Sequence, residues 1–110
     1  MSRAVALGEL ADVIRSKNAG PFLLALDLLF RDEARYRLVR DSGVLTRSRI
    51  AGLYRIAEAD VVGLESFDAA QAIKVTLRRA RSAGGPGDTD VYGAQQHAPL
   101  LDLPIPLPSS

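Results

Sequence analysis

Residues 22–30 form a nearly continuous apolar stretch, with hydrophobic side chains at eight of nine positions. Its length and the Gly-Pro turn that precedes it favour a strand buried on both faces, which would be central in its sheet. Apolar and polar residues alternate over 72–79, which predicts a strand with one face open to water. Residues 61–67 are predicted to form the strand that precedes 72–79 in the chain. These three strands would form the body of one sheet.

Helical periodicity appears before and after the apolar stretch. Apolar residues spaced i, i+3, i+4 and i+7 predict a short helix over 7–14. Asp32 as an N-cap predicts a helix over 33–42, and Thr46 predicts a second helix that continues to Ile56. Together the second and third helices would cross over between the strands at 22–30 and 61–67.

The C-terminal stretch 100–108 carries proline at alternate positions, which removes amide donors along one side only and predicts an edge strand. With a short helix over 88–97, the order is strand, helical crossover, strand, strand, short helix, strand. This order predicts an α+β fold of the ferredoxin-like, split βαβ type (β-α-β-β-α-β). It has an antiparallel-rich four-stranded sheet with helices on one face, and residues 22–30 would lie parallel to 72–79.

Length and charge narrow the class of protein. The 110 residues suit one domain, expected over 1–108 with a mobile tail at 109–110. The formal net charge of +1, from 14 basic and 13 acidic residues, argues against a nucleic-acid partner. The first apolar run contains charged residues, and no stretch reaches the length of a membrane span, so no membrane partner and a cytoplasmic location are expected.

The polar residue types that chemistry requires concentrate in 84–99, which holds the single histidine and four of the nine glycines. A glycine-rich loop that leads into a helix N-terminus is typical of an anion site, with Gly87, Asp88, Thr89 and Asp90 as candidate ligand-binding residues. The two carboxylates could instead hold a divalent cation. The alternative is a turn whose glycines and capping Asp88 serve structure alone, and the sequence names neither a metal nor a cofactor.

Four further residues of this segment are candidates for a site. His97 could act as a general acid or base, because imidazole titrates close to neutral pH, and Tyr92 could assist in proton transfer. Gln95 and Gln96 could bind a ligand through their amides. The alternative for His97 is structural, since a helix C-terminus favours the charged form of a histidine.

Arg15, Lys17 and Asn18 precede the apolar stretch and could together bind a carboxylate or phosphate, unless they merely form an exposed turn. In the ferredoxin-like arrangement this turn and Asp88 start at opposite ends of the sheet, roughly 30 Å apart for a nine-residue strand. A shared site would then need a second subunit. An oligomer or a hetero-complex is therefore predicted.

Asp27 is the one polar residue of the apolar stretch, on the face shared with Leu23, Ala25 and Leu29. An unpaired buried carboxylate would cost several kcal/mol, roughly, so a partner is required. Lys74 or Arg78 is the predicted partner.

Two stretches, 14–22 (IRSKNAGPF) and 86–101 (PGDTDVYGAQQHAPLL), resemble the two signature blocks of a bacterial family called domain of unknown function 4387. The resemblance covers nearly the whole chain. That family is similar in layout to the small ferredoxin-fold domain that accompanies the acyclic-terpene-utilisation protein A (AtuA) family. This implies a small subunit working with an AtuA-like large subunit on organic acids or acyl-CoA, and it implies no known catalytic residue.

Three hypotheses about function follow. The first is an accessory subunit of a heteromeric AtuA-like enzyme of organic-acid or acyl-CoA metabolism. The second is a stand-alone lyase or hydratase that uses His97 and Tyr92 for proton transfer. The third is a non-catalytic ligand-binding or oligomeric domain.

Overall fold

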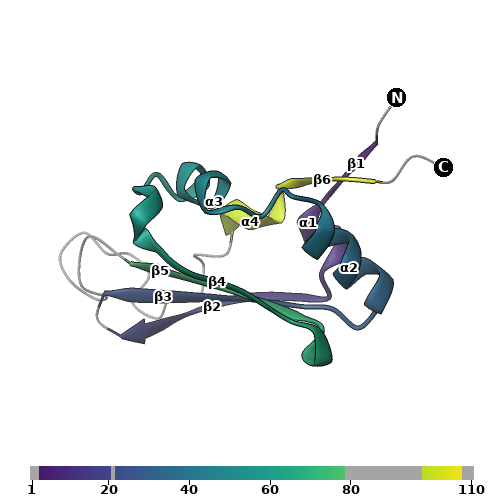
Figure 1. Cartoon of the computed structure of the whole chain (residues 1–110), viewed down its shortest axis with the longest axis horizontal. Helices are drawn as coiled ribbons and strands as arrows, with labels where there is room; N and C mark the ends of the chain where they lie inside the picture. Colours follow the sequence, from purple (N-terminus) through teal and green to yellow (C-terminus); the bar gives the residue numbers. More distant parts are fainter. Residues whose placement is uncertain (1–2, 21, 79–97, 108–110) are drawn as a thin grey trace.

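The computed structural model describes residues 3–20, 22–78 and 98–107. Within them a four-stranded antiparallel sheet has the spatial order β2-β3-β5-β4, and a separate two-stranded sheet pairs β1 with β6. Helices α1 to α4 lie on one side of the larger sheet (Figure 1). In chain order the elements are β1 (Ala4–Ala6), α1 (Leu7–Leu10), β2 (Val13–Gly20), β3 (Leu23–Leu29), α2 (Glu33–Asp41), α3 (Arg47–Tyr54), the 3-10 turn η1 (Glu58–Asp60), β4 (Val61–Phe67), the 3-10 turn η2 (Asp68–Ala70), β5 (Ala72–Arg78), α4 (Ala98–Leu101) and β6 (Pro104–Pro106).

Strand β3 is central, as its apolar sequence predicts, and its two faces differ. Leu24, Leu26 and Leu28 face the helices and are almost fully buried. On the opposite face Ala25 is buried but Leu23, Asp27 and Leu29 are only half-buried, so the prediction of burial on both faces is wrong. We call these two sides of the sheet the covered face and the open face.

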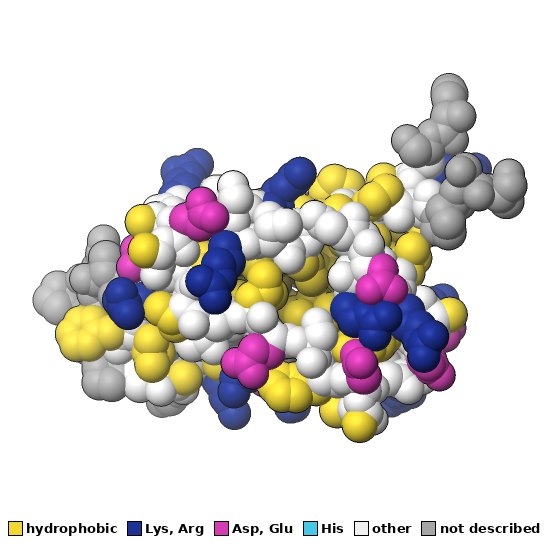
Figure 2. Space-filling view, viewed as in Figure 1, with side chains coloured by type: hydrophobic (Ala, Val, Ile, Leu, Met, Phe, Trp, Pro, Cys, Tyr) yellow, Lys and Arg dark blue, Asp and Glu magenta, His cyan; other side chains and the backbone are white. Residues whose placement is uncertain are grey.

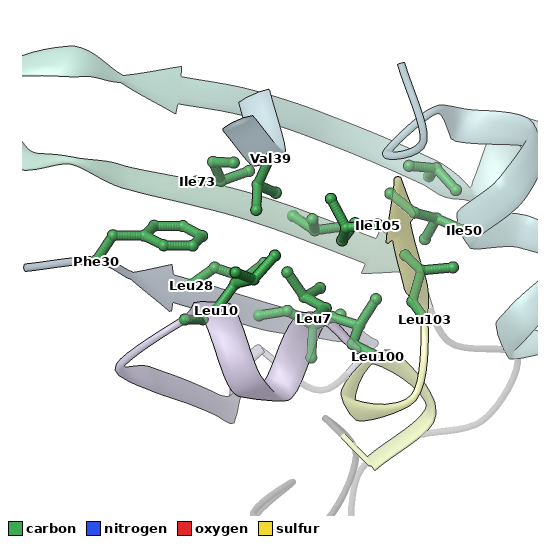
Figure 3. Packing of buried hydrophobic residues seen from close by; sticks show 14 of the residues in the cluster. Leu7, Leu10, Leu28, Phe30, Val39, Ile50, Ile73, Leu100, Leu103 and Ile105 are labelled. Atoms are coloured by element: carbon green, nitrogen blue, oxygen red, sulfur yellow. The ribbon is translucent and has the colours of Figure 1, made fainter. Parts of the chain in front are cut away.

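The core lies between the covered face and the helical layer. Figure 3 shows residues of the helices and of β6 packed over residues of β3 and β5. Burying aliphatic and aromatic side chains here contributes most of the favourable free energy of folding. The largest fully buried side chains are Tyr36, Leu7, Leu26, Leu28, Ile50, Leu100, Ile105, Val39, Val61 and Val75.

Both predicted helix caps are confirmed. The Asp32 carboxylate accepts a hydrogen bond from the Ala34 amide at 2.8 Å, and the Thr46 hydroxyl accepts one from the Arg49 amide at 3.1 Å. Helix α3 ends two residues earlier than predicted, because Arg55 adopts a left-handed conformation with φ of 56°. These caps satisfy amides that a helix N-terminus leaves without an intrahelical partner.

The segment predicted as the end of a first helix and a turn is the edge strand β2. Helix α1 is a single turn, Leu7–Leu10, and the chain is extended from Val13 onward. A tight turn at Gly20, whose φ is +147°, returns the chain into β3 as a hairpin. The alternation was obscured because Ser16 and Asn18 occupy covered-face positions that usually hold apolar residues.

The strand order differs from the ferredoxin-like one. Strand β3 pairs with β5 antiparallel, with Leu23 opposite Arg78 and Leu29 opposite Ala72, whereas the ferredoxin-like arrangement requires these strands to be parallel. The hairpin partner β2 occupies the side of β3 that the C-terminal strand was expected to take. The chain is α+β with helices on one face, but its sheet has a different topology.

The C-terminal strand β6 leaves the main sheet. It pairs only with β1 among the described strands, with Val5 opposite Ile105, as expected for a strand between Pro104 and Pro106 that can bond on one side. Ile105 is fully buried and carries β6 onto the core. The expectation of a single neighbour is confirmed, and the expected place at the edge of the four-stranded sheet is wrong.

Antiparallel pairing of β3 with β5 can be tested by cross-linking, because the chain has no cysteine of its own. Leu23→Cys with Arg78→Cys places two thiols at paired positions, whose Cα atoms are roughly 5 Å apart in an antiparallel ladder. We expect an intramolecular disulfide after mild oxidation at high dilution. The measurement is the loss of two hydrogen atoms by mass spectrometry of the monomer.

The matched control combines Leu23→Cys with Ala72→Cys, which the structure places at opposite ends of the pair of strands. A parallel arrangement would bring those two positions together and separate the first two. Cross-linking of the control pair in place of the first would contradict this topology.

Candidate functional site

The antiparallel sheet changes how the predicted site residues relate to one another. Arg15 and Lys17 lie on β2 with their side chains on the open face, opposite Asp27 and Ala25 of β3. Asn18 pairs with Leu24 and therefore faces the other side. The three residues do not form one anion-binding group, although Arg15 and Lys17 share a face.

The remaining predicted site residues lie outside the described part of the chain, so their roles stay predictions. They are Gly87, Asp88, Thr89, Asp90, Tyr92, Gln95, Gln96 and His97.

The two polar segments do not start at opposite ends of the sheet, as the ferredoxin-like arrangement predicted. Because β3 and β5 are antiparallel, the start of β3 lies beside the end of β5, where Arg78 pairs with Leu23. The first signature block therefore ends at the point where the chain leaves β5 toward the second block. The geometric reason for requiring a second subunit is removed.

We define the sheet end as Lys17, Phe22, Asp60 and Arg78. Phe22, in the turn between β2 and β3, is 51% exposed. Arg78 forms an ion pair with Asp60, with 3.7 Å between Nη1 and Oδ1. Lys17 is exposed on the neighbouring strand. Aromatic residues and arginine, here Phe22 and Arg78, are enriched in protein interfaces.

On the open face, four charged residues lie in register across all four strands. The charge row is Arg15, Asp27, Lys74 and Glu65, from β2, β3, β5 and β4 in that order. Signs alternate along the row, so each neighbouring pair is attractive, with roughly 0.2–1 kcal/mol for such cross-strand pairs. These four residues are aligned only because the pairing of the four strands places them at the same level of the sheet.

Asp27 has the partner that its position requires, but a different one from those predicted. The ion pair that the structure shows joins its Oδ2 to Nε of Arg15 at 3.8 Å. Lys74 lies directly opposite Asp27 on β5, and Arg78 pairs with Asp60 instead. The Asp27 side chain is 20% exposed, so water also solvates the carboxylate.

Rows of smaller and apolar residues flank the charge row on the open face. At one side Val13 and Phe67, on the outer strands, are 40% and 44% exposed. Half-buried Leu29 and Ala72 lie between them. The row on the other side consists of Lys17, Ala25, Thr76 and Gly63.

A second polar cluster joins α2 to η2, between β4 and β5. The Tyr36 hydroxyl donates to Oδ1 of Asp68 at 2.5 Å, and Nη1 of Arg40 donates to the same oxygen at 3.0 Å. Arg40 also makes a two-pronged contact with Asp41, at 2.9 and 3.0 Å. The guanidinium lies over the Tyr36 ring, 5.5 Å from its centroid, a cation–π contact.

Each pKa shift in this cluster has a physical cause. Burial raises the pKa of Tyr36, and its bond to Asp68 raises it further. The hydrogen bonds from Tyr36 and Arg40 hold the pKa of Asp68 below its ordinary value, and Arg40 does the same for Asp41. Both carboxylates raise the pKa of Arg40. Because every member is paired to another, the cluster links α2 to the connection between β4 and β5.

Other surfaces of the described chain offer less chemistry. A shallow groove of about 680 Å³ runs between α2 and the end of β6, lined by residues that include Leu38, Ser42 and Leu107. On the side seen in Figure 2, acidic and basic side chains are interspersed around apolar ones. Among the described residues, no three His, Cys, Asp or Glu side chains gather as a metal site would need, and none of the helices could cross a membrane.

The described residues define a small α+β domain with an open, charge-patterned sheet face, an architecture that does not itself specify a function. The chain belongs to the family described as Domain of unknown function (DUF4387), whose model matches residues 7–104. The resemblance of the two signature blocks is thereby confirmed. No curated protein and no solved structure matches the chain.

The Asp68 cluster predicts a pH dependence of stability. Because the pKa of Asp68 is lowered in the folded state from 3.8, its stabilisation is present above the unfolded pKa. It is lost as the pH falls through the lowered, folded pKa. We expect Asp68→Asn to lower the urea midpoint at about pH 7 and to lose less stability on acidification to about pH 3.

Glu58→Gln is the matched control, since Glu58 is an exposed carboxylate on η1 outside the cluster. It should leave both midpoints close to those of the unchanged chain. An Asp68→Asn variant with the same acid sensitivity as the unchanged chain would contradict the assignment.

Proposed function

We propose that this chain is a small accessory subunit of a heteromeric enzyme of organic-acid or acyl-CoA metabolism, with an AtuA-like large subunit as its partner. The sheet end is the surface that contacts this partner. The nature of the partner rests on the resemblance of the two signature blocks. The choice of surface rests on the structure.

The observation that carries the proposal is that the first signature block ends at the sheet end, beside the last described residue of β5. The first block supplies Lys17 and Phe22, and the chain toward the second block departs beside Arg78. Phe22 is 51% exposed, so a partner that covers its ring would gain free energy by removing apolar surface from water. Arginine and aromatic residues are the types that most often dominate interface energetics.

Chemistry at this end would come from the assembled complex. Lys17 and Arg78 supply positive charge that suits a carboxylate or a phosphate group. Both are shared features of organic acids and of acyl-CoA. The large subunit would supply the remaining groups around the substrate.

Co-expression with an AtuA-like protein encoded beside a member of this family tests the proposal. We expect the tagged chain to retain the large subunit through size-exclusion chromatography. Phe22→Ser should weaken retention roughly tenfold or more, as for an interface hot spot. Phe67→Ser is the matched control, because Phe67 is a similarly exposed phenylalanine that lies away from the sheet end, on β4.

Activity measurements separate this proposal from the stand-alone enzyme. The accessory subunit predicts turnover of candidate acids by the complex and little by the isolated chain. Turnover by the isolated chain that is abolished by His97→Gln would favour the lyase or hydratase instead. Failure of the chain to retain the large subunit would overturn the proposal.

A further inference from the structure

The open face shares Lys17 with the sheet end, but it differs from the sheet end because its charged residues are complementary to those of a second copy. We propose that the open face binds the open face of a second copy of this chain, about a two-fold axis that runs parallel to the strands between β3 and β5. The contact would be a sandwich of two four-stranded sheets, and it goes beyond the partner contact proposed above.

The charge row supplies the first argument. A two-fold axis parallel to the strands reverses the strand order, so β2 faces β4 of the second copy and β3 faces its β5. Arg15 then faces Glu65 of the second copy, and Asp27 faces its Lys74. Symmetry repeats each of these two contacts, so all four contacts along the row join opposite charges.

The other in-plane axis does not give this result. A two-fold axis perpendicular to the strands lays each strand over its own copy, so Arg15 would face Arg15 and Asp27 would face Asp27. Like charges opposite one another are unfavourable in an interface. Charge therefore selects one orientation of the second copy.

Side-chain size supplies the second argument. Under the same axis Lys17 faces Gly63 of the second copy, which has no side chain to obstruct the long lysine. In the row on the other side, Leu29 faces the small Ala72. Each flanking row therefore contains a contact of a large residue with a small one, which favours close packing between the sheets.

The third argument is the apolar surface that the contact would bury. Val13 would face Phe67 of the second copy, and both are about two-fifths exposed in the single chain. Packed sheets lie roughly 10 Å apart, a gap that arginine, lysine and glutamate side chains from the two copies can span. The carboxylate of Asp27 would then lie among cations of both copies, which offsets the cost of removing it from water.

The size of the face sets the expected affinity. Four strands of about seven residues present a surface roughly 20 Å wide and 23 Å long. This is at the low end of the areas buried by specific interfaces. We expect a dissociation constant on the order of micromolar, so that the monomer and the dimer are both observable.

Sedimentation equilibrium of the isolated full chain across about 1–200 µM tests the proposal, at the affinity scale just given. We expect the unchanged chain to dimerise. Glu65→Lys and Arg15→Glu should each weaken dimerisation roughly tenfold or more, because each creates two symmetry-related repulsive contacts. Mixed in equal amounts, the two variants should form a heterodimer, because both contacts are then attractive.

The matched controls make the same charge changes outside the open face. Glu58→Lys on η1 and Arg49→Glu on α3 alter exposed residues on elements outside the sheet. They should leave the dimer unchanged, and circular dichroism of every variant confirms that the fold is retained. Recovery of the dimer on mixing is a result that loss of folding cannot produce.

Three outcomes would overturn the proposal. The first is a chain that stays monomeric at the highest concentration. The second is a dimer whose dissociation constant is unchanged by both Glu65→Lys and Arg15→Glu. The third is two variants that do not associate when mixed. Retention of the large subunit by Glu65→Lys would at the same time show that the partner contact is separate.

Discussion

The register between β3 and β5 is the constraint on which both faces of this molecule depend. Leu24, Leu26 and Leu28 face the helices only because the pairing aligns them with the apolar positions of β5. The same alignment puts Asp27 opposite Lys74. A slip of one residue would exchange the two faces, exposing the leucines and burying the charges, so the hydrophobic core and the charge row are specified together.

Among the described residues the helical layer covers one side of this sheet, and the chemistry of the two faces follows from that asymmetry. On the covered side, Tyr36 and Arg40 tie α2 to Asp68, which fastens the helices to the end of the β4–β5 pair. On the open side, β3 tolerates an aspartate at its centre because water and Arg15 solvate the carboxylate. A strand buried on both faces would not accept it.

Local signals were predicted well, and long-range pairing was not. The caps at Asp32 and Thr46 are hydrogen bonds between residues two or three positions apart, so the residue types alone predict them, and both are present. Strand β2 was missed because Ser16 and Asn18 replace the apolar residues that make alternation visible. The candidates Arg15 and Lys17 were found by their charge, but Lys74 and Glu65, which complete the charge row with Arg15 and Asp27, come from strands far along the chain.

The sequence by itself determined the family, the class of fold, the central strand and the capped helices, because these depend on composition, on residue spacing and on contacts within a few residues. Only the tertiary structure decided that β3 and β5 are antiparallel, that β6 pairs with β1, and that four charges form one row across the sheet. Parallel and antiparallel neighbours have similar local patterns, since either one buries alternate residues. The choice between them depends on how the chain packs its helices over the sheet, a property of the whole molecule.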